Sequence, residues 1–154
     1  MALVAELSDI GQFIRNLRVR ARFGKLSRSP LSLLRLEVQG EAASCDLLAR
    51  RADPWDSSLP GHVAETHVSV QALHDAIEVR ELLFRTLPEI TSAELRVFRQ
   101  RECSDLELII SGKVARDQQA MRFFHSVAMR AKFFGLQFWL EDGILGTLRT
   151  EGPM

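Results

Sequence analysis

The chain has 154 residues, of which 46% are apolar, and its 20 Lys and Arg residues balance 20 Asp and Glu residues to a formal net charge of zero. This composition excludes a largely disordered chain, and the apolar stretches are too short for a membrane-spanning helix of about 20 residues. Two cysteines exclude a disulfide-rich scaffold, and acidic residues near the N-terminus are untypical of a secretory signal. We therefore expect a soluble, cytoplasmic, single domain over residues 1–149 and a frayed tail over 150–154.

Residues 3–19 predict an amphipathic helix, because apolar residues recur there at alternating spacings of four and three. This apolar stripe consists of Leu3, Leu7, Ile10, Ile14 and Leu17. The stripe spans only two heptads, which is too short to indicate a coiled coil. The helix must therefore pack either on its own domain or on a partner, as an interface element.

The rest of the chain alternates between strand and helix patterns. The further predicted elements are a β-hairpin over 31–50, a loop over 53–61, a helix over 64–86, strands over 93–98 and 106–114, a helix over 117–134 that ends at Gly135, and a strand over 136–141. The order helix, hairpin, helix, hairpin, helix, strand predicts an α+β fold in which three helices pack on a mainly antiparallel sheet.

The second half of the chain carries a family resemblance. The order helix, strand, strand, helix, strand over residues 66–146 is similar to that of BON domains. The segment 106–114, LELIISGKV, is similar to the strand and glycine that precede the second helix of that family, and 134–136, FGL, resembles the close of that helix. The resemblance implies binding to phospholipid or other envelope surfaces.

The longest run of one charge sign lies between Asp9 and Glu37. Its members are Arg15, Arg18, Arg20, Arg22, Lys25, Arg28 and Arg35. Such a run can contact a nucleic-acid backbone or anionic lipid headgroups, so Arg18, Arg20 and Arg22 are candidate binding residues. Basic residues also stabilise a helix C-terminus, and a chain without net charge exerts no long-range attraction on polyanions.

Arg80 and Trp55 are two further candidate binding residues. Arg80 falls on the apolar side of the second predicted helix, between Leu73 and Phe84. We expect its guanidinium to be at least half buried and paired with a carboxylate, because an unpaired buried charge is costly. Arg80 then belongs either to a structural ion pair or to a pocket for an acidic ligand. Trp55 either contacts a partner or anchors its loop to the core.

Two groups of apolar residues fall outside the predicted core. Met129 and Phe133 lie four residues apart on the polar side of the third helix. Phe98, Ile109 and Trp139 fall on the sheet face opposite the core alternation of their own strands. Exposed apolar surface of this kind marks interfaces, and two-fold dimers bury the same surface from both subunits. We expect a homodimer, unless the first helix covers this sheet face within one chain.

No residue pattern indicates catalysis, a cofactor or a metal site. His67 and His74 share one helix face, but seven residues separate them by about 10 Å along the axis, too far for one metal ion. The chain has no glycine-rich phosphate loop and no serine in a nucleophile elbow. The sequence therefore favours a non-enzymatic domain that acts through protein–protein interaction and self-associates. The alternative function is binding to nucleic acid or phospholipid through residues 15–35.

Overall fold

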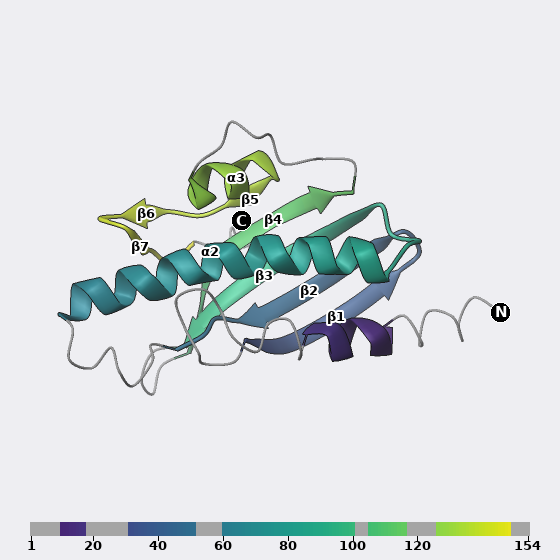
Figure 1. The fold of residues 1–154 in the computed structure, drawn as a ribbon, viewed down its shortest axis with the longest axis horizontal. Helices are drawn as coiled ribbons and strands as arrows, with labels where there is room; N and C mark the ends of the chain where they lie inside the picture. Colours follow the sequence, from purple (N-terminus) through teal and green to yellow (C-terminus); the bar gives the residue numbers. More distant parts are fainter. Residues whose placement is uncertain (1–9, 18–30, 52–59, 101–104, 117–125, 149–154) are drawn as a thin grey trace, which may run out of the picture.

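The structure is a computed structural model, and it describes residues 10–17, 31–51, 60–100, 105–116 and 126–148. In chain order the elements are a helical segment over 10–17, β1 (Ser32–Gln39), β2 (Ala42–Leu48), α2 (Gly61–Thr86), β3 (Ser92–Gln100), β4 (Leu106–Ala115), α3 (Val127–Phe133), β5 (Leu136–Gln137), β6 (Leu140–Glu141) and β7 (Ile144–Leu145). These elements confirm the predicted α+β class and the mainly antiparallel sheet (Figure 1).

Strands β1 to β5 form one sheet in the order β1-β2-β3-β4-β5, and β6 and β7 form a separate hairpin. Neighbouring strands in the sheet run antiparallel except β2 and β3, which are parallel. Parallel neighbours require a crossover connection. Helix α2 lies within that crossover and extends along one face of the sheet, which we call the inner face (Figure 1). The opposite face is called the outer face.

The predicted last strand over 136–141 is divided into two strands that belong to different sheets. β5 pairs with β4, whereas β6 pairs with β7. The chain returns after β6 through Asp142 and Gly143, which have φ values of +53° and +82°. Two consecutive positive φ angles are typical of a type I′ turn, the usual connection of a tight hairpin. This turn begins directly after residue 141, where the predicted strand also ends.

Two glycines allow β5 to approach β4 closely. A Cβ atom on Gly112 would lie 2.3 Å from the carbonyl oxygen of Gly135, so only glycine fits there. Gly135 has a φ of +97°, in the left-handed region that glycine adopts without strain. The prediction that Gly135 ends the third helix is confirmed, because α3 stops two residues before it.

One hydrophobic core includes residues from α2, the inner face of the sheet and the N-terminal helical segment. Phe13 is fully buried and Leu17 is 5% exposed, and both belong to the same core cluster as Leu83 of α2 and Leu47 of β2. Residues 10–17 therefore pack on their own domain. Phe13 is the most buried residue of this segment, although it lies outside the apolar stripe predicted from the sequence.

Candidate interaction surface

The outer face of the sheet is mainly polar on β1, β2 and β3. Cys45 of β2 is fully buried in the core beside its β3 partner Leu95. Because side chains alternate along a strand, the next pair, Asp46 and Arg96, points to the outer face. Arg35 of β1 is the other strand partner of Asp46 and points the same way. Three neighbouring strands thus place charged residues side by side.

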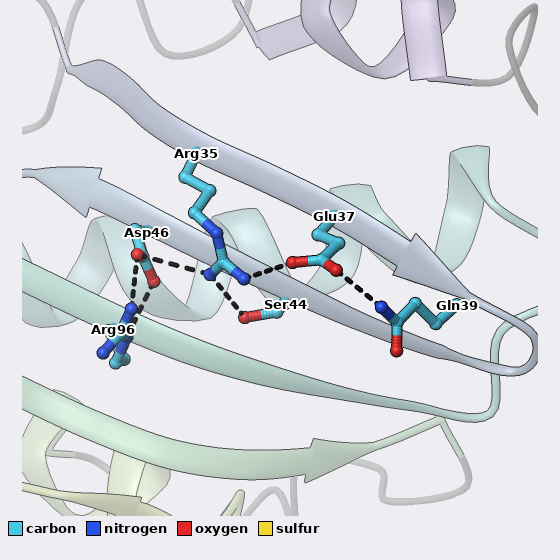
Figure 2. Close-up of polar contacts among 6 residues, drawn as sticks. All are labelled: Arg35, Glu37, Gln39, Ser44, Asp46 and Arg96. Carbon is cyan, nitrogen blue, oxygen red and sulfur yellow. Dashed lines mark hydrogen bonds and ion pairs between the residues drawn. The ribbon is translucent and has the colours of Figure 1, made fainter.

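These residues form a continuous row of charges across the three strands (Figure 2). Arg96 donates two hydrogen bonds to Asp46, from Nε to Oδ1 at 2.8 Å and from Nη2 to Oδ2 at 2.6 Å. Arg35 Nη1 lies 3.6 Å from Asp46 Oδ2 on the other side, and Arg35 Nη2 donates to Glu37. Gln39 donates from Nε2 to Glu37 Oε1 at 2.6 Å. We call Arg96, Asp46, Arg35 and Glu37 the charge row.

The members of the charge row differ in burial, and Asp46 is the least exposed of them. The Asp46 side chain is only 8% exposed, and its two hydrogen bonds raise the pKa of Arg96 above the ordinary arginine value. Arg35 and Glu37 are 45% and 44% exposed. An exposed ion pair of this kind contributes little to the stability of a single chain. The Asp46–Arg96 pair is therefore part of the fold, whereas Arg35 and Glu37 remain accessible to a partner.

A shallow hollow of about 300 Å³ lies beside the charge row on the outer face. Its charged lining combines Arg35 and Lys113 with Glu37 and Glu94. Two residues of each sign give the hollow no general preference for an anion or a cation. The arrangement suits a surface of mixed charge better than a pocket for one small ion.

Charged residues near α2 hold the fold together, and the partly buried Arg116 is one of them. Arg116 donates from Nε to Ile90 O at 2.8 Å, from Nη1 to Phe84 O at 2.7 Å and from Nη2 to Leu87 O at 2.7 Å. These carbonyl groups lie at and just after the C-terminus of α2, where a helix has no further backbone donors. Arg116 therefore supplies a donor to Phe84 O in the last turn and ties the end of α2 to the residues that follow it.

Arg80 is 5% exposed, which confirms the predicted burial. Its Nη2 donates to Ala115 O at 2.7 Å, and its guanidinium lies 4.0 Å from the centre of the Phe134 ring and 5.3 Å from that of Phe84. Burial lowers the pKa of Arg80 below the ordinary arginine value. The two aromatic faces offset part of this desolvation through cation–π contacts. A carboxylate partner for Arg80 stays a prediction.

A second buried ionic group lies where β2 ends beside α2. Asp75 accepts from Arg50 Nε at 2.8 Å and Nη2 at 3.1 Å, and from Gln71 Nε2 at 2.9 Å. All three residues are at least 95% buried. Burial raises the pKa of Asp75, and the hydrogen bonds from Arg50 and Gln71 oppose this shift. The group links the end of β2 to the middle of α2.

The structure corrects the predicted apolar patch on the outer face. Ile109 is 1% exposed and belongs to the core cluster. The reason is a β-bulge: Val97 pairs with Ile110 but Phe98 pairs with Leu108, so Ile109 is an extra residue in β4. The bulge breaks the strict alternation on which the prediction rested. Ile109 therefore cannot join an exposed patch.

The other candidate residues have different surroundings. Met129 is 52% exposed and Trp139 is 64% exposed. Phe133 is half-buried against the core, with its ring edge-on to Phe134 at a centroid distance of 5.6 Å. The predicted pair on the third helix is thus reduced to one exposed side chain, Met129. The candidates Arg18, Arg20, Arg22 and Trp55 lie outside the described residues.

Sequence reasoning noted Arg35 only as part of the basic run and did not include Glu37, Asp46 or Arg96 among the candidates. The sequence carries a local signal for the proximity of Arg35, Glu37 and Asp46. Gly40, between two alternating segments, indicates a two-residue hairpin turn, and that turn alone places Arg35 opposite Asp46. The Arg96 contact depends on the parallel pairing of β2 with β3, which has no local signal.

No family model, no curated protein and no solved structure matches this chain. The resemblance to BON domains consequently stays a prediction. Within the described ranges, no helix is long and apolar enough to cross a membrane. The same ranges contain no group of three or more His, Cys, Asp or Glu side chains positioned to hold a metal ion.

Proposed function

We propose that this protein is a non-enzymatic binding and assembly domain that self-associates as a homodimer. The observation that supports this proposal is the position of β1. Among the described strands, this eight-residue strand is the last one at one edge of the sheet, and it carries the exposed residues Arg35 and Glu37 of the charge row. An edge strand presents backbone N–H and C=O groups that another strand can bind.

The distribution of the other charged residues also supports a binding role. Arg116 binds backbone carbonyl groups, and Asp75 binds two side chains inside the fold. Arg116 and Asp75 therefore make their contacts within the fold, and neither of them lines the hollow of the outer face. Arg35 and Glu37 differ, because they are almost half exposed and lie at the edge of the sheet. They are available to a second molecule.

The alternative function, binding to anionic surfaces, has less support in the described part of the basic run. Arg35 already contacts two acidic side chains, Glu37 and Asp46. Its charge is therefore locally balanced. No contact of Arg35 favours a phosphate ligand over a protein partner, and we retain self-association as the proposed function.

Sedimentation equilibrium tests the proposal directly. From low to high micromolar concentration, the mass is expected to rise from the monomer value of 17.4 kDa to twice that value. Met129→Glu is the matched control on an exposed apolar residue of α3, and it should leave the association unchanged. A monomer mass that persists at high micromolar concentration would contradict the proposal. Loss of the dimer in the Met129→Glu protein would move the interface to α3.

A further inference from the structure

We infer that β1 pairs in antiparallel orientation with β1 of a second copy, in the register that places the two-fold axis at Leu36. This inference rests on the proposed self-association and specifies its surface and geometry. It depends on three features of β1: the direction of its backbone groups, the sign of its outer-face charges and its exposed leucine.

The direction of the backbone groups follows from the hydrogen bonds between β2 and β3. Ala49 N–H donates to Phe98 O at 2.8 Å, and Glu41 O accepts from Thr91 N–H at 2.7 Å. Odd-numbered residues on the β2 side therefore bond toward β3. Backbone groups of successive residues point to opposite sides of a strand, so the even-numbered residues of β2 bond toward β1.

The β1 partners of these even-numbered residues are Arg35, Glu37 and Gln39. Their backbone N–H and C=O groups point toward β2. Leu36 and Val38 lie between them and pair with Cys45 and Ala43, respectively, without sharing hydrogen bonds. The N–H and C=O groups of Leu36 and Val38 therefore point away from β2, to the outer edge of the sheet. No described strand lies beyond that edge.

The charges of β1 select one register. A two-fold axis at residue 35 would place Arg35 opposite Arg35, and an axis at residue 37 would place Glu37 opposite Glu37. Directly opposed like charges destabilise a strand pair, and opposite charges stabilise it. An axis at Val38 would set Glu37 against the uncharged Gln39. Only an axis at Leu36 places Arg35 of each copy opposite Glu37 of the other.

The same register uses the backbone groups that point outward. Leu36 faces Leu36 of the second copy, and the two residues can exchange both N–H···O bonds because their groups point to the outer edge. Arg35 and Glu37 of the second copy then form a pair without shared backbone bonds, in which side chains lie closer together. Within one copy the charges alternate in sign from Arg96 through Asp46 to Arg35 (Figure 2). In the dimer, Glu37 of the second copy would extend this alternation.

The exposed leucine of β1 favours the same contact. Leu34 is 43% exposed, and it is the extra residue at the bulge between Leu33 and Arg35. The register centred on Leu36 brings Val38 of the second copy beside Leu34. Pairing then removes apolar surface from water, which stabilises the complex.

Cysteine mapping tests the register. In the Leu36-centred dimer, residues 35 and 37 of the two copies have Cα atoms about 4.5 Å apart, within reach of a disulfide, whereas residue 35 lies about 7–8 Å from its own equivalent. Arg35→Cys and Glu37→Cys are made separately in a Cys103→Ser background and treated with a mild oxidant. The native Cys45 is buried, and burial raises the pKa of its thiol to about 12, so it does not compete.

An equal mixture of the two variants is expected to form several-fold more covalent dimer than either variant alone. The mixed dimer also keeps one ion pair, between Glu37 of one chain and Arg35 of the other. The control is a mixture of Arg35→Cys with Gln39→Cys, which lies one register step away on the same face and should link poorly. Efficient linking of Arg35→Cys alone, or of Glu37→Cys alone, would overturn the Leu36 register.

Hydrogen–deuterium exchange of the wild-type protein provides a second test that needs no substitution. The Leu36 and Val38 amides should exchange more slowly at concentrations where the mass has doubled than in dilute solution. A doubled mass with unchanged exchange at both amides, or with no disulfide in any mixture, would overturn β1 pairing and leave the proposed self-association standing. A monomer at every concentration would overturn both.

Discussion

The inner and outer sides of the sheet use arginine in different ways. On the inner side, Arg116 donates to three backbone carbonyl groups, and Arg50 binds the buried Asp75. On the outer side, Arg35 is 45% exposed and forms an ion pair with Glu37 at the sheet edge. The contact partners and the burial of a charged residue thus decide whether it stabilises the fold or remains accessible to another molecule. Inner charges should control stability, and the charges on β1 should control association.

The largest expected effect is at Asp75. Asp75→Leu removes the carboxylate that accepts from Arg50 and Gln71 and so takes the opposite charge away from the buried Arg50 guanidinium, at an expected cost of about 3–5 kcal/mol in the free energy of unfolding. Asp75→Asn keeps an accepting oxygen and should cost less. Denaturant unfolding measures both, with the exposed Glu78→Gln as control. Equal, small effects for Asp75→Leu and Glu78→Gln would remove the distinction between the two sides.

The pH dependence of stability sharpens this prediction. Burial raises the pKa of Asp75, so the folded state holds that proton more tightly than the unfolded state. The resulting stabilisation is fully present below the ordinary aspartate pKa of about 3.9, and it is lost as the pH rises through the folded-state pKa. Wild-type stability should therefore contain a component that falls over this window. The Asp75→Asn protein should lack it.

The next effect is at Arg116. Arg116→Met removes three donors from carbonyl groups around the C-terminus of α2, and we expect a loss of about 2–4 kcal/mol. Arg85→Met is the matched control, because Arg85 is an exposed arginine in the last turn of the same helix. Thermal unfolding followed by circular dichroism compares the two. Equal melting temperatures would contradict the capping role of Arg116.

Two substitutions of Arg80 separate the contribution of its charge to stability from the contribution of its side-chain volume. Arg80→Ala leaves a cavity between the Phe84 and Phe134 rings and should cost about 2–4 kcal/mol. Arg80→Met keeps an aliphatic stem against those rings and should be tolerated better. Chemical denaturation gives the order of the two variants. Equal losses in the two variants would mean that the hydrogen bond to Ala115, which both variants lack, outweighs packing.

The smallest effect on stability is expected on the outer side. Arg35→Gln removes an exposed ion pair, so the free energy of unfolding should change by no more than about 0.5 kcal/mol. The same variant loses two contacts across the proposed two-fold axis, and its association constant should fall by about tenfold. Unfolding of the dilute monomer and sedimentation at high concentration separate the two quantities. A large loss of monomer stability would place Arg35 with the inner charges.

The α+β fold class could be predicted because it follows from local patterns of apolar and polar residues. Alternating residues in the hairpins and the apolar side of α2 gave an order of elements that the described structure roughly follows, except at the last predicted strand. The errors have local physical causes. The bulge in β4 turned Ile109 into the core, and the Asp142-Gly143 turn, a strong hairpin signal, was overlooked. Phe13 was missed because it lies beside the regular stripe and is buried only through tertiary packing.

The candidate interaction surface was only partly predictable. The Gly40 turn fixes the β1–β2 register and therefore the neighbourhood of Arg35 and Asp46. The position of Arg96 depends on a parallel pairing across a crossover that contains the 26 residues of α2. Such non-local contacts are determined by the whole core rather than by spacing in the sequence. Burial of Asp46 on an otherwise open face could not be read from alternation alone.

The most direct measurement of the central claim is sedimentation equilibrium of two charge-reversed variants, Arg35→Glu and Glu37→Arg, alone and in equal mixture at low salt. Each variant alone opposes like charges across the axis, so each should remain near 17.4 kDa. The mixture restores opposite charges at both positions and should approach twice that mass. Circular dichroism confirms that each variant is folded. If the wild type dimerises while the mixture stays monomeric, or if each variant alone associates as tightly as the wild type, the charges of β1 do not direct assembly.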